Sequence, residues 1–322
     1  MKYAFACLLF SSFLSTAGYA QSTVTSDLLK KNVSDTILQP RTLFLPEPFD
    51  GSKALLKLFP GKHYKFPEKS YNRELINWEC KTCPRVAYPD ANEDAVDAFP
   101  YAEGVATRLM NVMDFKDADS VPYKVISFNH SAYDPDGLQV SRFTGGLLGL
   151  AKFMLTKDGW RLRMFQPAIA AYGAFSQCPK TTPLLIGDGQ YAFMIKHMNG
   201  GAGGPFYGVY FMIAGTNGAY QQVMAAYVIE KTAMAEEEGL SYWNSEYSVP
   251  ASDKKYFRDI LITTDGVCRA TDLESLPDAV KTLMKGRKQA HFRMVQRYVY
   301  KGSKGYQQEG PATATLTSPA KK

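Results

Sequence analysis

Four of the five cysteines, those that lie after the N-terminal apolar run containing Cys7, are the residues whose type and spacing most directly suggest chemistry. Cys80 and Cys83 form a Cys-x-x-Cys pair, which can be a redox-active dithiol, half of a zinc site or a structural disulfide. Trp78 lies one residue too far from the first cysteine for a thioredoxin-like site, so we expect a disulfide. Cys178 and Cys268 are isolated and could complete a zinc site only as single ligands. Four cysteines allow three pairings, and we favour Cys80–Cys83 together with Cys178–Cys268.

Histidines and acidic residues offer little for a metal site. Residues 90–97 have the alternating acids of a calcium loop, but Ala95 and Tyr101 stand where such a loop needs glycine and an acid. We interpret this segment as a solvated loop. The histidines form no His-x-His or His-x-x-x-His pattern, and we interpret each as a surface or capping residue. They are His63, His130, His197 and His291. No metal and no cofactor is predicted.

Nucleophile motifs are equally weak. Ser-x-x-Lys occurs at Ser252–Lys255 and at Ser318–Lys321, but the Ser-Asp-Asn and Lys-Thr-Gly motifs that accompany it in penicillin-binding proteins are absent. We interpret both as chance matches. A glycosidase would need two carboxylates at a defined separation, which is a spatial property that the sequence hides. We therefore nominate no catalytic residue.

A glycine-rich loop is the strongest candidate for a binding surface. A phosphate-binding loop needs a helix immediately after it, because helix N–H groups hold the anion. Here an aromatic strand from Phe206 to Ala214 follows, so the loop is either a hairpin turn or a recognition loop whose aromatic flank can stack on a sugar or a partner surface. The candidate residues are Asn199, Gly200, Gly201, Gly203, Gly204, Phe206 and Tyr207.

The elements that must position this loop are strands. From Gly145 to Gly215 apolar runs alternate with turns such as Asp158-Gly159 and Asp188-Gly189, which is typical of antiparallel hairpins. No βαβ alternation occurs, which argues against a Rossmann-type enzyme. Residues 100–115 and 272–285 have helical periodicity. We predict a mainly β protein with a few short helices, and antiparallel sheets in a sandwich- or barrel-like arrangement.

Composition divides the 322 residues into four parts. Residues 1–20 have the basic start, short apolar run and small residues before Gln21 that are typical of a signal peptide. Residues 21–77 read as an extended, proline-containing segment laid against the main body. Residues 78–309 form the predicted β-rich globular domain, and 310–322 read as a disordered tail. We expect a periplasmic or secreted protein, without a transmembrane segment in the mature chain.

The formal net charge is +6, and it is unevenly spread. From Lys281 onward ten Lys or Arg face one acid, Glu309. Such a region can bind nucleic acid, anionic lipid or cell-wall polymer, or it can simply be a solvated surface. The charges are not interleaved with aromatics, so we favour the solvated surface and expect no nucleic-acid partner.

Five short runs in the central segment form a recognisable pattern, namely Gly149–Phe153, Asp158–Trp160, Gln166–Ile169, Gly173–Phe175 and Leu185–Gly187. This pattern resembles one found in uncharacterised secreted bacterial proteins. Its residues are packing and turn residues, so the resemblance implies a location and a fold but no activity.

Two functional hypotheses follow from these observations. We favour a protein that binds a protein or an envelope component on a disulfide-stabilised β scaffold, with the glycine-rich loop as contact surface. The alternative is a hydrolase of envelope polymers with acidic catalytic residues. An enzyme would need convergent polar groups in a concave pocket. Asp, Glu or His side chains that converge beside Gly200–Gly204 would contradict a binding-only interpretation, whereas a flat, mobile loop free of such groups would contradict the hydrolase.

Overall fold

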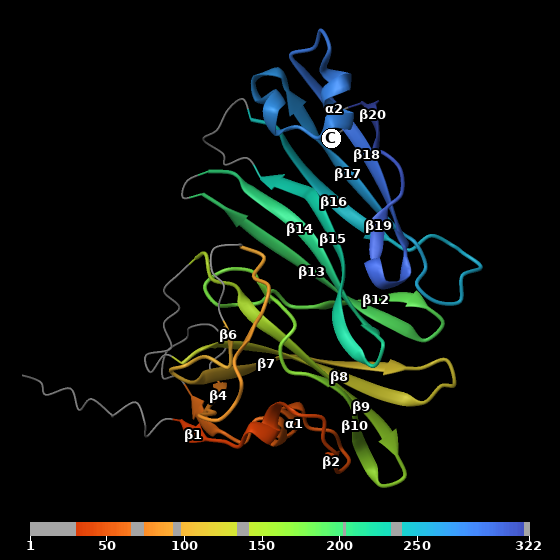
Figure 1. Ribbon diagram of the computed structural model, residues 1–322. Coiled ribbons are helices and arrows are strands. Elements are labelled where there is room, and N and C mark those ends of the chain that lie inside the picture. The colour runs from red at the N-terminus through yellow and green to blue at the C-terminus, as the bar shows by residue number, and fades with distance from the viewer. Residues whose placement is uncertain are drawn as a thin grey trace, which may run out of the picture.

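The computed structural model describes residues 30–65, 74–92, 98–133, 142–201, 204–232 and 240–318. Within these ranges the chain forms two nine-stranded β-sheets, a two-stranded sheet and a few short helices (Figure 1). The prediction of a mainly β fold with antiparallel sheets is confirmed. The predicted signal peptide lies outside the described residues.

The first large sheet, here the N-terminal sheet, has the strand order β1-β4-β7-β8-β9-β10-β2, with β3 also paired to β4 and β11 to β9. All of its pairs are antiparallel except β1 with β4. Its strands are β1 (Lys31–Asn32), β2 (Phe44–Leu45), β3 (Lys62–Lys65), β4 (Glu74–Glu79), β7 (Val105–Lys116), β8 (Pro122–Ala132), β9 (Gly146–Thr156), β10 (Gly159–Gln166) and β11 (Ala171–Tyr172). The small sheet pairs β5 (Val86–Ala87) with β6 (Ala98–Phe99).

The second large sheet, the C-terminal sheet, is an antiparallel meander in which β12 to β19 lie in sequence order, and β20 pairs with β18. One sheet of the fold curls into a half-barrel. Its strands are β12 (Thr182–Gly187), β13 (Gln190–Gly200), β14 (Phe206–Thr216), β15 (Ala219–Thr232), β16 (Tyr242–Ser248), β17 (Ile260–Arg269), β18 (Gln289–Tyr300), β19 (Tyr306–Gln308) and β20 (Thr313–Thr317). The hairpins predicted between Gly145 and Gly215 are all present, and they span both sheets.

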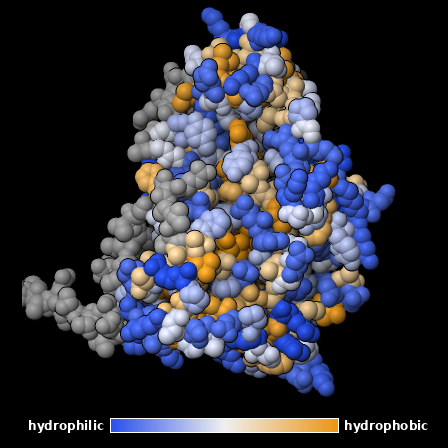
Figure 2. Space-filling model, in the orientation of Figure 1, coloured by the Kyte–Doolittle hydropathy of each residue, from blue (hydrophilic) through white to orange (hydrophobic). Residues whose placement is uncertain are grey.

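The buried hydrophobic residues form separate clusters, one of which lies between the two large sheets. In Figure 1 the C-terminal sheet lies above the N-terminal sheet, with α1 (Gly51–Leu58) below and α2 (Asp278–Lys281) at the top. Leu148 and Leu150 of β9 share one buried cluster with Phe193 of β13 and Ile213 of β14, so the sheets pack face to face there. Hydrophilic residues cover most of the face in Figure 2, and hydrophobic ones gather in its central part.

Residues 21–77 contribute more regular structure than the sequence predicted. The segment supplies β1 to β3 and part of β4, and the residues Leu55 to Leu58, predicted as extended, belong to α1. The Asp50 side chain accepts a hydrogen bond of 3.0 Å from the Lys53 N–H, which caps the helix. Leu55 and Leu58 are buried on its inner face. The described parts of this segment, residues 30–65 and 74–77, therefore form an integral layer of the fold.

The helix predicted over residues 100–115 is wrong. Residues from Val105 onward form β7, which is hydrogen-bonded to β4 on one side and to β8 on the other. A register shift between Leu109 and Asn111 interrupts the alternation of inward and outward side chains. That interruption makes the apolar spacing resemble a helical period. The second predicted helix is present as short pieces, namely α2 between two 3-10 turns.

The prediction of a disordered tail from Gly310 onward is wrong for residues 313–317. These residues form β20, which pairs along β18 from His291 to Val295. Thr313, Thr315 and Thr317 alternate in this strand, and β-branched residues favour extended backbone. The composition suggested disorder because it is rich in Pro, Ala and Thr, but the alternation was the better signal. Residues 319–322 lie outside the described residues.

The cysteines confirm one predicted pairing and contradict the other. Cys80 and Cys83 form a disulfide. Cys178 and Cys268 are free, buried thiols, so the predicted bond between them is wrong. Cys178 packs in the cluster between the two sheets, whereas Cys268 of β17 packs under α2 in a different cluster. The two thiols therefore belong to separate parts of the core.

Burial should make both free thiols unreactive in the folded protein. It raises the pKa of Cys178 and that of Cys268, and the thiolate is the reactive form. In protein that lacks residues 1–20, a thiol reagent should label neither cysteine under native conditions and two per chain in denaturant without reductant. If no thiol were labelled in denaturant, the predicted Cys178–Cys268 bond would be present after all. If four thiols were labelled, the Cys80–Cys83 disulfide would be absent.

Candidate functional site

A cavity of about 290 Å³ lies between the two sheets, at the end where β13 and β14 meet the glycine-rich loop. We call it the inter-sheet cavity. Its polar and aromatic lining comes from a loop before β6 and from β11, β13, β14 and β15. These residues are Asp90, Tyr172, His197, Asn199, Tyr207, Phe211, Gln222 and Tyr227. Chain segments far apart in the sequence therefore converge on one hollow.

Two larger hollows lack this combination of groups. One of about 470 Å³ lies against residues 302–308 and shares Gln222 and Tyr227 with the inter-sheet cavity, and one of about 490 Å³ lies beside α2. Neither is lined by a histidine among the described residues, and the acid in the second hollow is Asp278, whose side chain is 98% exposed. A third hollow, also of about 290 Å³, is lined by residues that include Tyr123, Lys152 and Asp188 but by no histidine among the described residues. The inter-sheet cavity combines a buried histidine with several hydrogen-bonding groups and exposed aromatic rings.

His197 is the most informative residue of the cavity. Its side chain is buried on β13, and Nδ1 accepts a hydrogen bond of 2.9 Å from the Gly173 N–H. Burial lowers the pKa of His197, and the charge of Asp90 only partly offsets this. The ring is therefore neutral near pH 7. Because Nδ1 accepts, the proton lies on Nε2, which makes that atom a hydrogen-bond donor.

A hydrogen-bond network holds the wall beside His197. Asn92 Nδ2 donates to Gly173 O at 3.0 Å and to Asp90 Oδ1 at 2.9 Å, and Asn92 Oδ1 accepts from Asn199 Nδ2. Asp90 Oδ2 accepts from the Gly145 N–H at 3.0 Å. The network joins the loop at residue 90, the turn at Gly173 and the end of β13. Such a wall is preorganised, because its side chains need little ordering when a ligand binds.

Tyrosines form the other wall and the rim. Tyr172 of β11 donates from its hydroxyl to Gln222 Oε1 of β15 at 2.7 Å, so this bond joins the two sheets. The Tyr172 ring also packs on Phe211, with centroids 5.0 Å apart. Tyr207 and Tyr227 are 43% and 59% exposed, respectively. These two rings are therefore accessible aromatic surfaces at the cavity.

A strained bulge in β15 sets the position of Tyr227. The pairing of β14 with β15 shifts register between Gly208 and Tyr210, opposite residues 227–229. Val228 has φ +61°, which is unusual for a β-branched side chain. The Trp243 Nε1–H donates to Val228 O at 2.9 Å and helps to hold this conformation. Bulges of this kind re-aim side chains next to functional sites.

The structure distributes the predicted loop residues between the cavity and its surroundings. Asn199 and Tyr207 line the cavity, whereas Gly200 and Phe206 lie in the flanking strands outside its lining. Arg142 supports the two strand ends that flank the glycine-rich loop. Its guanidinium donates to Gly200 O at 2.6 Å and lies 5.7 Å from the Phe206 ring. Gly201 and Gly204 have open space beside them, and Gly203 lies outside the described residues. The strand that follows the loop is β14.

The histidine interpretation needs a correction. His130 and His197 are 0% and 4% exposed, so they are core and cavity residues and not surface residues. The interpretation of residues 90–97 as a solvated loop is wrong at Asp90, whose carboxylate accepts three hydrogen bonds within the fold. Residues 93–97 lie outside the described residues. No group of three His, Cys, Asp or Glu arranged for a metal ion occurs in the described part of the chain.

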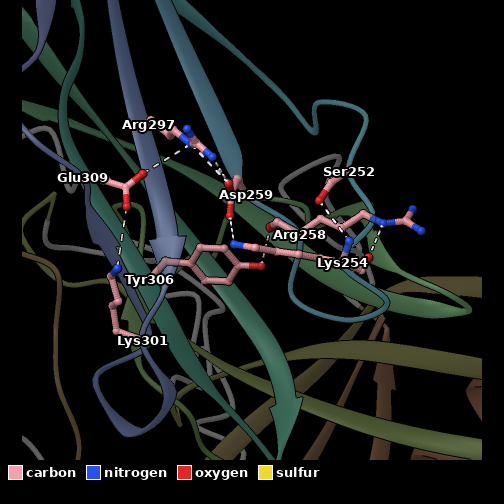
Figure 3. Close-up of polar contacts among 8 residues, drawn as sticks. All are labelled: Ser252, Lys254, Arg258, Asp259, Arg297, Lys301, Tyr306 and Glu309. Carbon is pink, nitrogen blue, oxygen red and sulfur yellow. Dashed lines mark hydrogen bonds and ion pairs between the residues drawn. The ribbon is translucent and has the colours of Figure 1, made fainter.

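Ser252 makes no catalytic pair with Lys255. Its Oγ accepts from the Lys254 N–H at 3.1 Å, and Lys255 Nζ lies over the Tyr256 ring, 5.4 Å from its centroid. Figure 3 shows Ser252 in the loop that leads to Asp259. The Ser252–Lys255 motif therefore forms a turn in this fold.

Several charges of the basic C-terminal region are matched by acids on neighbouring strands. Arg297 donates to Asp259, which also binds Lys254, and Glu309 bridges Arg297 and Lys301 (Figure 3). Burial raises the pKa of Asp259, but its hydrogen bonds with Lys254 and Arg297 outweigh this and lower it. Such pairing reduces the positive field that a polyanion would meet.

No helix in the described ranges is both long and apolar enough to cross a membrane.

Comparisons of the chain with protein-family models, curated proteins and solved structures found no match.

The cavity itself tells against nucleophilic or paired-carboxylate catalysis. A Ser-His-Asp arrangement needs the histidine Nδ1–H to be donated to a carboxylate, whereas His197 Nδ1 accepts from backbone. Asp90 is the single carboxylate in the described lining, which contains no Ser, Thr or Cys. Its oxygens already accept N–H groups. The arrangement can hold a ligand through neutral donors, acceptors and aromatic faces.

Tyr172, Gln222 and Tyr227 were not foreseen from the sequence. One signal was present, because His197 and Asn199 are two residues apart in a strand, as are Tyr207, Val209 and Phe211, and such residues share a face. The contribution of Tyr172 depends on how the two sheets pack, which no local pattern reveals.

Proposed function

We propose that this protein is a periplasmic or secreted binding protein and that the inter-sheet cavity is its recognition site. The observation that carries the proposal is the preorganised polar wall around His197, which faces accessible tyrosines beside the glycine-rich loop. Ligand sites combine apolar and aromatic surface with a few fixed polar groups, and this cavity has that composition. The signal-like residues 1–20 and the Cys80–Cys83 disulfide support the proposed location.

The partner in this proposal is a component of the cell envelope, recognised through the cavity and its rim. The paired charges around Asp259 favour recognition by shape and hydrogen bonding over general attraction to a polyanion. A hydrolase of envelope polymers stays as the second candidate, because Asp90 and His197 both line the cavity. The geometry of both side chains favours binding.

Retention of envelope components on immobilised protein tests the proposal. The chain from residue 21 onward should retain a component that the double variant Tyr207→Ala, Tyr227→Ala retains about ten-fold less, because buried aromatic contacts often dominate binding. Tyr242→Ala is the matched control, since Tyr242 is 45% exposed on β16 and does not line the cavity. Equal loss in Tyr242→Ala would contradict the assignment of the cavity.

A second measurement separates binding from hydrolysis. Envelope polymers incubated with the protein should release no fragments on chromatography. If fragments appear and Asp90→Asn or His197→Gln abolishes them, the hydrolase is correct and the binding proposal fails.

A further inference from the structure

We infer that the inter-sheet cavity binds an uncharged sugar ring, with Tyr227 as a stacking surface and His197 and Gln222 as hydrogen-bonding groups. This inference rests on the proposed binding function and names the chemical class of the ligand. It is carried by the combination of exposed aromatic rings with neutral hydrogen-bonding groups in a hollow of about 290 Å³.

The charge of the lining selects against ionic ligands. No Lys or Arg lines the cavity among the described residues, so a phosphate, sulfate or carboxylate ligand would find no counter-ion there. A cationic ligand is disfavoured near Tyr207, because Lys231 Nζ already lies 5.7 Å from that ring. The Asp90 carboxylate accepts hydrogen bonds from Asn92 and Gly145, which stabilise it without a cation.

The hydrogen-bonding groups fit hydroxyls, which both donate and accept. His197 Nε2–H is a donor, since Nδ1 is occupied by the Gly173 N–H. The Gln222 amide has its oxygen held by the Tyr172 hydroxyl, which leaves its NH₂ group as a donor, and that hydroxyl can accept in turn. A ring that carries several hydroxyls can satisfy donors and acceptors together, whereas a purely apolar ligand would leave them unpaired.

The aromatic rings fit the apolar face of a sugar ring. A pyranose has apolar C–H groups on its faces and hydroxyls around its edge, so it can pack on a flat aromatic ring while its edge forms hydrogen bonds. Tyr227 is 59% exposed and is held out by the Val228 bulge. The volume lies at the small end of ligand pockets, which suits a single ring, either free or at the end of a longer glycan.

Binding of a panel of sugars to the chain from residue 21 onward tests this inference. The neutral probes are glucose, galactose, mannose and N-acetylglucosamine, each as monosaccharide and as a linear oligosaccharide, at millimolar concentrations. Glucuronic acid and choline chloride are the charged comparisons. We expect ligand-observed NMR to detect at least one neutral probe, and calorimetry to show binding weakened about ten-fold in Tyr227→Ala. Stronger binding of the oligosaccharide would indicate a glycan end, and equal binding a free sugar.

Variants then connect binding to the cavity. Tyr227 also lines the hollow against residues 302–308, so Tyr207→Ala, at a residue that lines the inter-sheet cavity and not that hollow, should weaken binding as well. Tyr227→Phe keeps the ring and should bind within about three-fold of wild type, whereas Tyr242→Ala should be unchanged. Both tyrosines are exposed on the surface, so folding should survive and circular dichroism can verify it. Sugar binding that Tyr227→Ala leaves unaltered would overturn the site.

The outcomes also separate this inference from the proposed function. If no neutral probe binds while the cavity variants still lose an envelope component, the sugar inference fails and the binding function stands. If only glucuronic acid or choline binds, the inference of a neutral ligand is overturned. If neither sugars nor envelope components depend on the cavity, both proposals fail.

Discussion

Replacing Lys231 by alanine should destabilise the protein by about 3–5 kcal/mol, because it leaves a carboxylate buried without its counter-ion. The Lys231 side chain is 1% exposed, and its ammonium binds Asp272 Oδ2 and donates to Ser275 Oγ at 2.8 Å. Asp272 Oδ2 also accepts from the Ser241 N–H at 2.9 Å. The pair therefore joins the end of β15 to the segment before α2.

The pKa of Asp272 follows from the same contacts. Burial raises it, but the hydrogen bond from Lys231 and the further donors around the carboxylate outweigh burial and hold it below its usual value. The carboxylate is thus charged in the folded protein. Removal of Lys231 takes away its principal compensation, and the buried Trp243 ring beside Lys231 cannot supply one.

Urea unfolding at neutral pH measures this effect against a matched surface pair. Arg293 and Asp265 form a bidentate ion pair between β18 and β17, but both side chains are more than half exposed. Arg293→Ala should therefore cost less than about 1 kcal/mol. The double variant Lys231→Met, Asp272→Leu should recover much of the stability lost in Lys231→Ala. Equal losses of unfolding free energy in Lys231→Ala and Arg293→Ala would show that the buried ion pair contributes no more to stability than the exposed one.

The hairpins from Gly145 to Gly215 could be predicted because their signals are local. Asp158-Gly159 and Asp188-Gly189 mark the turns, and Gly159 and Gly189 have φ values of +106° and +58°, which favour glycine. The error over residues 100–115 also has a local cause. A bulge at residues 109–111 interrupts the two-residue repeat on which strand prediction relies. The α1 helix was missed although Asp50 stands at its N-cap position.

The site was harder to predict because its residues meet through packing. Asp90, Tyr172 and Gln222 come from three separate segments: a β-bridge places Asp90 beside Ala171, and the packing of the two sheets brings Gln222 to Tyr172. The glycine-rich loop lies at the same end of the molecule as the cavity, since Asn199 and Tyr207 flank the loop and line the cavity. The cysteines show the same limit. Local spacing predicts the Cys80–Cys83 bond correctly, whereas nothing local indicates that Cys178 and Cys268 lie in different parts of the core.

Acid should destabilise the fold through His130, which is buried without charge in the N-terminal core. The Trp78 Nε1–H donates to Thr107 Oγ1 at 2.8 Å, and the Thr107 hydroxyl can donate to His130 Nδ1 at 2.7 Å. The His130 Nε2–H then donates to Pro167 O at 3.1 Å. Both ring nitrogens are thus occupied in the neutral tautomer.

Burial lowers the pKa of His130 to about 3, and the hydrogen bond to Pro167 only partly opposes this. An unfolded histidine has a pKa of about 6.5, so between these values the unfolded chain binds a proton that the folded chain does not. The free energy of unfolding should therefore fall as the pH falls through this window, by about 1.4 kcal/mol per pH unit from this residue. Above about pH 6.5 the contribution of His130 is constant.

Urea unfolding of wild type and His130→Gln between about pH 7.5 and about pH 4 measures this contribution, since the window lies on the acid side of the unfolded pKa. At neutral pH the variant should lose about 1–3 kcal/mol, because the buried hydrogen bonds of the ring are removed. Its stability should then fall less steeply with acid than that of wild type, so the two curves converge as the pH falls. His197 is also buried with a lowered pKa, and some slope should persist in His130→Gln for that reason. Parallel curves would contradict the role of His130, whereas convergence would show that a neutral imidazole in the core limits the stability of this protein in acid.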